Sequence, residues 1–174
     1  NLESIRIYPA TELILTEEQL QEGMKKIATD AKKQSEALRK EFLTEEAHRL
    51  SSHVKELQEQ VLELKAVVNL ESYINYFFKE TKSFIELFEE EKSCIFLDEP
   101  LRLREHSEGV EAEFRESMSH RMEKGYVLKK QADILYGKNE ILAKIEKYPS
   151  VQIGFMEEKK LLIKTANRFS RDIF

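Results

Sequence analysis

The sequence predicts an α/β protein, in which helices flank a partial parallel sheet and a long antiparallel helical hairpin protrudes. The apolar run Cys94–Leu97 ends in two adjacent carboxylates, Asp98 and Glu99. Buried parallel strands end in this way where an open α/β sheet places ligand-binding groups. Upstream of this run, apolar residues recur at alternating spacings of three and four over two long segments, which is typical of packed helices.

Length and composition favour one sizeable soluble domain. The chain has 174 residues, of which 41% are hydrophobic, and its 28 basic and 33 acidic residues give a net charge of -5. Because the two signs are interspersed, nucleic-acid binding by this segment alone is disfavoured. A single cysteine and the lack of an apolar stretch of about 18 residues predict a reducing, cytoplasmic location. The start at Asn1 indicates a piece of a longer protein.

Two helices of similar length are expected to form the hairpin over residues 16–68. Thr16–Gln19 has the form of a capping box, and the first helix should run for about 24 residues. Its seam consists of Leu20, Met24, Ile27, Ala31 and Leu38, with Gln34 in the one polar slot. After a break near Lys40–Leu43, Thr44 caps a second helix with the seam Leu50, Val54, Leu57, Val61, Leu64 and Val68. Each arm would be about 36 Å long.

Aromatic residues follow the hairpin too densely for a surface and predict two short helices in the core: Tyr73, Tyr76, Phe77, Phe78, Phe84, Leu87 and Phe88. Base stacking is the less favoured alternative, because no Arg or Gly lies among these rings. Pro100 should start another helix, which Gly125 ends, with one apolar side formed by Leu103, Val110, Phe114, Met118 and Met122. A helical segment over 134–145 and strands over 151–156 and 161–165 complete the expected order.

Few constellations in the sequence suggest catalysis. The one Gly-Lys pair, Gly137-Lys138, lacks the other residues of a phosphate-binding loop, with Ala132 where the first glycine would stand. Neither pair of histidines, His48 with His53 or His106 with His120, has a spacing that suits a metal, so solvated histidines are expected. Cys94 is expected to be a buried core thiol with no base nearby. Asp98 and Glu99 remain, and their simplest interpretation is that they end a strand, with Glu99 at the start of the next helix.

Four short motifs follow one another in the chain, at Ile5–Glu12, Glu46–Leu50, Leu70–Tyr73 and Asp98–Glu99. In this order they resemble the UvrB-like module shared by the excision-repair helicase subunit UvrB and the transcription-repair coupling factors. In that family the motifs read roughly "IYPAS", "EAQRL", "IENYS" and "DESH", respectively. Pro100 and Leu101 depart from the last motif, and the Arg- and Glu-rich stretch that follows, Leu103–Phe114, looks more similar to the coupling factors. The resemblance extends over about residues 3–156.

The resemblance implies a partial RecA-like helicase sheet and a non-catalytic scaffold fragment. Residues 1–156 would form part of the module called domain 1b, and 157–174 a strand or linker toward the next domain. Asp98 and Glu99 would be the relic of a degenerate Walker B nucleotide site, so no catalytic, cofactor or metal residue is expected in the fragment. The parent would be an ATP-dependent DNA translocase that uses ATP and magnesium in a separate motor, displaces stalled RNA polymerase and recruits UvrA.

Two alternatives stay open at this point. The chain could come from an active UvrB-type ATPase whose phosphate loop lies upstream, or it could be an unrelated coiled-coil interaction module. The apolar edge left uncovered in an isolated fragment also makes a homodimer an expectation.

Overall fold

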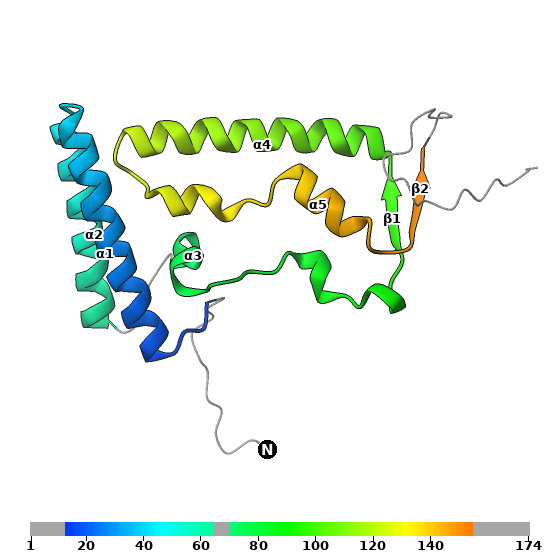
Figure 1. Cartoon of the computed structure of the whole chain (residues 1–174), viewed down its shortest axis with the longest axis horizontal. Coiled ribbons are helices and arrows are strands. Elements are labelled where there is room, and N and C mark those ends of the chain that lie inside the picture. The colour runs from blue at the N-terminus through cyan, green and yellow to red at the C-terminus, as the bar shows by residue number, and fades with distance from the viewer. Residues whose placement is uncertain (1–12, 65–69, 155–174) are drawn as a thin grey trace, which may run out of the picture. The chain divides into compact units, whose positions relative to one another are not determined.

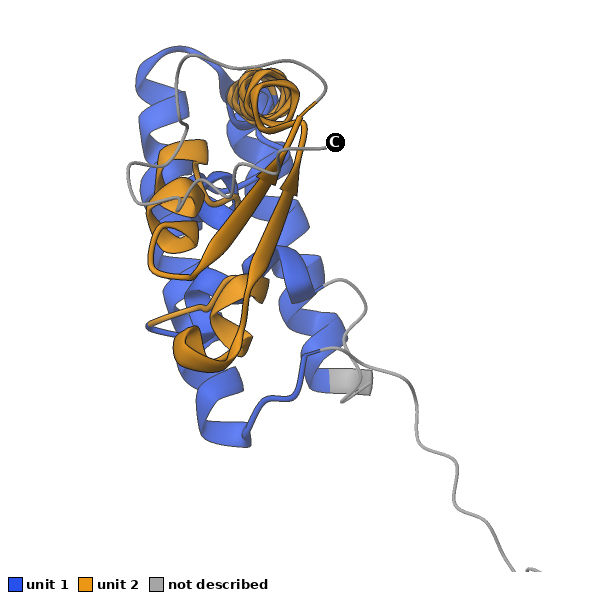
Figure 2. Ribbon diagram, turned by 90° about the vertical axis from the view of Figure 1, so that its right-hand side faces the viewer, with its two compact units in different colours: residues 1–79, 121–134 blue, residues 80–120, 135–174 orange. Residues whose placement is uncertain are grey.

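The computed structural model describes residues 13–64 and 70–154, and it divides the chain into two compact units (Figures 1 and 2). Unit 1 consists of residues 1–79 and 121–134, and unit 2 of residues 80–120 and 135–174. The described part is mostly helical with one two-stranded parallel sheet. This is consistent with the predicted α/β class, whereas the RecA-like relationship stays a prediction. None of the described helices is both long and apolar enough to cross a membrane.

Helix α1 (Glu17–Lys40) begins and ends where the sequence predicts. The Gln19 backbone N–H donates to Thr16 Oγ1 at 3.2 Å, and the Thr16 N–H donates to Gln19 Oε1 at 3.0 Å. This reciprocal capping box satisfies two backbone donors that the first helical turn leaves without partners. The helix ends in a turn in which Phe42 adopts a left-handed φ of 64° and is 92% exposed.

Helix α2 (Thr44–Leu64) runs back along α1, and their apolar seams pack together. The buried residues of this seam are Met24, Ile27, Ala31, Leu38, Ala47, Leu50, Val54, Leu57 and Val61. Its polar member is Ser35 rather than Gln34: the Ser35 hydroxyl lies 3.3 Å from the Ala47 carbonyl oxygen and 2.9 Å from Ser51 Oγ. Seam position Leu64 has no described side chain, and Val68 lies outside the described residues.

Three short elements complete the core of unit 1: η1 (Leu70–Tyr73), α3 (Ile74–Phe77) and η4 (Lys129–Ile134). Tyr73, Tyr76 and Phe77 are buried, as predicted for the first part of the aromatic stretch. Gly23 makes this packing possible, because a Cβ at that position would lie 2.1 Å from the Phe77 ring.

Unit 2 contains the two strands, β1 (Ile95–Asp98) and β2 (Ser150–Ile153), which pair in parallel with Phe96 opposite Val151. Helix α5 (Lys138–Ile145) covers one face, where Leu97 and Ile145 are buried together. On the other face Phe96 is 67% and Ile153 is 52% exposed. The prediction of a buried strand therefore holds for only one face, because the described sheet has two strands and a helix on one side.

The expectation that Cys94 is buried was wrong. The strand begins one residue later, at Ile95, and the Cys94 thiol is exposed. The second half of the aromatic stretch is not core either, since Phe84 and Leu87 of η2 (Phe84–Leu87), and Phe88 after it, are exposed.

Helix α4 (Pro100–Glu123) follows β1, and the division between the units falls within it. Its predicted apolar side is only partly covered: Met118 is buried, whereas Leu103 and Val110 are nearly half exposed. The short η3 (Glu90–Lys92) precedes β1. The strand predicted over 161–165 lies outside the described residues.

Candidate functional site

Asp98 and Glu99 lie at the carboxyl end of β1, as the sequence predicts. Asp98 is exposed and stands opposite Ile153 of β2. Glu99 has a left-handed φ of 48°, and its N–H donates to the Ile153 carbonyl at 2.7 Å. Its own carbonyl accepts from the Leu103 N–H at 2.9 Å. The Glu99 backbone thus links the end of the sheet to the start of α4, which gives this position a structural purpose.

The pair Gly137-Lys138 lies at the start of α5, where it binds the carboxylate of Glu111 from α4. The Lys138 N–H donates to Glu111 Oε2 at 2.9 Å, and the Lys138 ammonium pairs with Glu108. The Lys138 N–H, with help from Arg115, lowers the pKa of the Glu111 carboxyl, and the Lys138 side chain lowers that of Glu108. Helix starts attract anions because their N–H groups are unpaired, and here an internal carboxylate meets that demand.

An apolar groove of about 330 Å³ lies in unit 2 between the first half of α4 and α5. Leu97 and Ile145, the buried pair of this unit, form its floor together with Ile141, while Leu103 and Val110 line it from α4. Such a groove can receive apolar side chains.

The four histidines and the cysteine lie at the surface of the described part of the chain. His48, His53, His106 and His120 are all exposed, as predicted. Within the ranges that the structure describes, no three residues among His, Cys, Asp and Glu lie close enough together to hold a metal ion.

Gln34 and Gln131 hold the turn at 127–131 in unit 1. The sequence predicts Gln34 only as the polar slot of the helix seam, and it does not single out Gln131. Gln34 donates to the Val127 carbonyl at 2.9 Å and accepts from the Lys129 N–H at 3.2 Å. Gln131 accepts from the Leu128 N–H at 2.8 Å and donates to Ser72 at 3.0 Å. Gln34 therefore joins the turn to α1, and Gln131 joins it to η1. The sequence carries one signal for Gln34, a polar residue in an otherwise apolar seam, and none for Gln131.

Lys144 and Tyr148 were also missed, and they hold η2 in unit 2. Lys144 Nζ lies 2.7 Å from Glu86 Oε2, and 4.1 Å from the centre of the Tyr136 ring. The Glu86 carboxylate raises the pKa of Lys144. The Tyr148 hydroxyl donates to main-chain carbonyls of the same segment. No local pattern marks these residues, because their partners lie about sixty positions away in the chain.

The described residues form a mostly helical α/β arrangement with one two-stranded parallel sheet, in which Gln34, Glu111 and Lys144 hold turns and helix ends. No family model matches the sequence. The chain is similar to the transcription-repair-coupling factor of Bacillus subtilis (strain 168), with 29% identity over 127 residues. The aligned part covers 73% of this chain and 10% of that protein, so the chain spans about a tenth of the length of the curated relative that it matches. This similarity supports, at the level of a class of DNA-repair protein, the resemblance predicted from the motifs.

Proposed function

We propose that this chain is a non-catalytic scaffold segment of a transcription-repair coupling factor. The observation that supports it best is the similarity over 127 residues to such a factor, together with the four motifs in the expected order. In this proposal residues 1–156 belong to the UvrB-like module, with a sheet of RecA-like ancestry, and 157–174 lead to the next domain. The scaffold positions neighbouring domains of the parent.

Local geometry is in keeping with a scaffold. The backbone of Glu99 joins the sheet to α4, and Glu111 takes up the helix start at the Gly-Lys pair. Catalysis is assigned to the rest of the parent, which we propose to be a cytoplasmic ATP-dependent DNA translocase with its own site for ATP and magnesium. UvrA, RNA polymerase and DNA are its proposed partners.

The test uses the full-length protein on DNA carrying a stalled RNA polymerase. We expect release of the polymerase that depends on ATP. Substituting Asp98→Asn with Glu99→Gln should leave ATP turnover within about twofold of the parent value, like the matched control Glu105→Gln on the exposed side of α4. Absence of polymerase release would overturn the proposal.

The position of Asp98 and Glu99 at the carboxyl end of a parallel strand favours a second candidate, a UvrB-type ATPase. That candidate predicts a fall in ATP turnover of at least about tenfold for the double substitution, with Glu105→Gln unaffected.

A coiled-coil module is the third candidate. It predicts that the chain associates through the hairpin. We expect no association through the hairpin, because α1 and α2 already bury their seams against each other.

A further inference from the structure

A cluster of exposed apolar side chains projects from η2 in unit 2. Phe84 is 76%, Leu87 is 69% and Phe88 is 49% exposed. The rings of Phe84 and Phe88 meet edge to face, with centroids 5.3 Å apart. We call Phe84, Leu87 and Phe88 the η2 patch. Three large apolar side chains in water over five residues contribute little to the stability of the fold.

The backbone beneath the η2 patch is fixed by a polar network. Glu86 Oε2 accepts hydrogen bonds from the Ser83 N–H and the Ser83 hydroxyl, both at 2.8 Å. It also accepts from the Lys144 ammonium, whose side chain is only 15% exposed. Three donor groups from two separate parts of unit 2 therefore hold Glu86, and with it the single helical turn.

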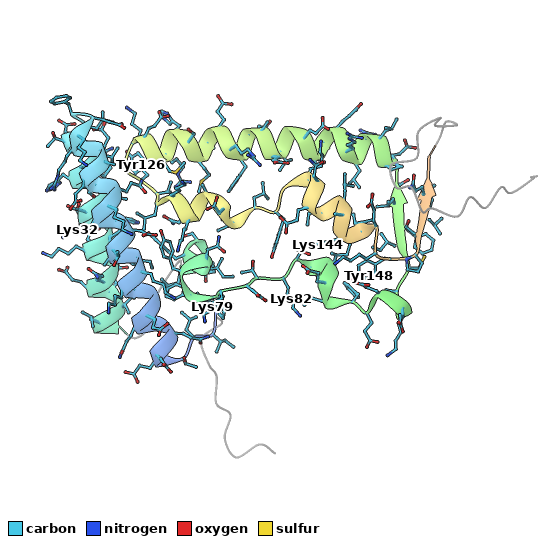
Figure 3. The ribbon with its side chains drawn as sticks, in the orientation of Figure 1. Lys32, Lys79, Lys82, Tyr126, Lys144 and Tyr148 are labelled. Atoms are coloured by element: carbon cyan, nitrogen blue, oxygen red, sulfur yellow. The ribbon has the colours of Figure 1, made fainter. Side chains whose placement is uncertain are left out.

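Tyr148 fixes the same segment from beneath. Its ring is buried, and its hydroxyl lies 2.8 Å from the Ile85 carbonyl oxygen and 3.0 Å from that of Phe88. Ile85 points inward and packs against Leu97 and Ile145. Figure 3 shows Lys144 and Tyr148 extending from α5 and the turn after it toward this segment. The η2 patch is thus presented outward by a rigid support, and pre-organised aromatic side chains lose little entropy when a partner binds.

Charge defines the chemistry of the partner. Within residues 80–92, acidic side chains outnumber basic ones, with Glu80, Glu86, Glu89, Glu90 and Glu91 against Lys82 and Lys92. Glu86 is paired with Lys144 and Glu89 with Lys92, which leaves Glu90 and Glu91, two exposed residues that follow Phe88 closely in the sequence, as the acidic side chains next in the chain to the patch. An acidic rim repels the phosphates of nucleic acids and repels a second copy of itself, but it attracts Lys and Arg around an apolar anchor.

We propose that the η2 patch is a docking surface for a protein segment that forms an amphipathic helix, with apolar anchors on one side and basic residues beside them. The anchors cover Phe84, Leu87 and Phe88, and the basic residues face Glu90 and Glu91. This inference rests on unit 2 alone and does not depend on the proposed function.

A displayed library of random peptides of about 16 residues, selected on the whole chain, provides the probe. Counter-selection uses the double variant Phe84→Ala with Phe88→Ala, whose circular dichroism should match that of the parent because both side chains are exposed. We expect enriched peptides with apolar residues at helical spacing and flanking Lys or Arg. Their affinity should fall at least about tenfold in the double variant and stay unchanged in Phe42→Ala, the matched control at another exposed phenylalanine.

Lys144→Met and Tyr148→Phe report on the support. Each should weaken binding of the enriched peptide about threefold or more while Phe84 and Phe88 remain. Enriched peptides that are acidic, or that bind the double variant as well as the parent, would overturn the proposal. Two other results would also overturn the proposal: a dimer in light scattering, or binding of an oligothymidine, if the double variant loses it. Either result would assign the patch to another class of partner.

Discussion

Glu86 joins a local helix cap to a long-range ion pair, so its charge links the fold to pH. Lys144 first, and then Ser83, lower the pKa of this carboxyl from its ordinary 4.5 to about 2. A depressed folded-state pKa gives stabilisation that is present above the ordinary value and is lost as the pH falls toward the folded value. We therefore expect the melting temperature of the parent to exceed that of Glu86→Gln at neutral pH, with the difference shrinking between about pH 4.5 and 2.

The control for this prediction is Glu91→Gln, which removes an exposed carboxylate from the same segment. Its melting temperature should follow that of the parent across the range. If Glu86→Gln did the same, the contact with Lys144 would contribute nothing in solution.

Two glycines in helices provide a matched pair with opposite expected signs. A Cβ at Gly23 would lie 2.1 Å from the Phe77 ring, whereas one at Gly109 in α4 would meet nothing within 4 Å. Gly109→Ala should stabilise the chain by about 0.5–1 kcal/mol, because alanine is the better helix former. Gly23→Ala should destabilise it by about 1–3 kcal/mol, because overpacking outweighs that gain. Urea unfolding followed by circular dichroism measures both, and equal signs would contradict the packing of α3 on α1.

Single residues at the candidate sites were predictable only where a local pattern marks them. Asp98 and Glu99 stand out because charge follows an apolar run, and the structure places them at the end of β1. In the sequence, no local pattern marks Lys144 or Tyr148. Their importance comes from hydrogen bonds to Glu86 and Phe88, and such tertiary contacts leave no signal in a local pattern.

At the scale of elements, Gln34 in the seam between α1 and α2 has a role that the spacing of apolar residues does not predict. Spacing alone treats Gln34 as a polar interruption that leucine would improve. In the structure Gln34 binds the Val127 carbonyl and the Lys129 N–H. We expect Gln34→Leu to lower the free energy of unfolding by about 1 kcal/mol, since two backbone groups lose their partner.

Glu36→Leu, on the exposed side of the same helix, is the control and should change the free energy of unfolding by less than about 0.5 kcal/mol. If chemical denaturation showed that Gln34→Leu stabilises the chain, apolar packing in the seam would outweigh the hydrogen bonds of Gln34 to the turn at 127–129, and the prediction would be wrong.

Long periodic helices were predictable, and short elements were not. The 24 residues of α1 repeat one pattern several times and start at a capping box. The aromatic residues at 84–88 occupy one short turn. The high density of apolar residues was the only sign of burial there, and it does not tell which side of a turn faces the core. Cys94 and Phe96 were expected to be buried for the same reason, since an apolar run does not reveal that only one face of a sheet is covered.

At the scale of the whole molecule, the two units differ in the size of their cores. Among the described residues, fourteen buried side chains form the cluster of unit 1, whereas Leu97 and Ile145 form that of unit 2. Local opening of a structure costs less free energy where fewer apolar contacts must be broken. The amides of α1 and α2 should therefore exchange with deuterium at least about tenfold more slowly than those of α5, β1 and β2, as measured by hydrogen exchange at neutral pH.

Matched core substitutions show whether the two cores respond independently. Leu97→Ala should speed exchange in α5 and in β1 and β2 and leave α1 and α2 unchanged, because Leu97 belongs to the cluster of unit 2. Leu50→Ala, in a seam position that is 1% exposed, should cost about 2–5 kcal/mol in unit 1 and speed exchange there. Equal acceleration throughout the described residues in both variants would mean that the chain opens as one cooperative body, and the division into two units would then have no energetic meaning.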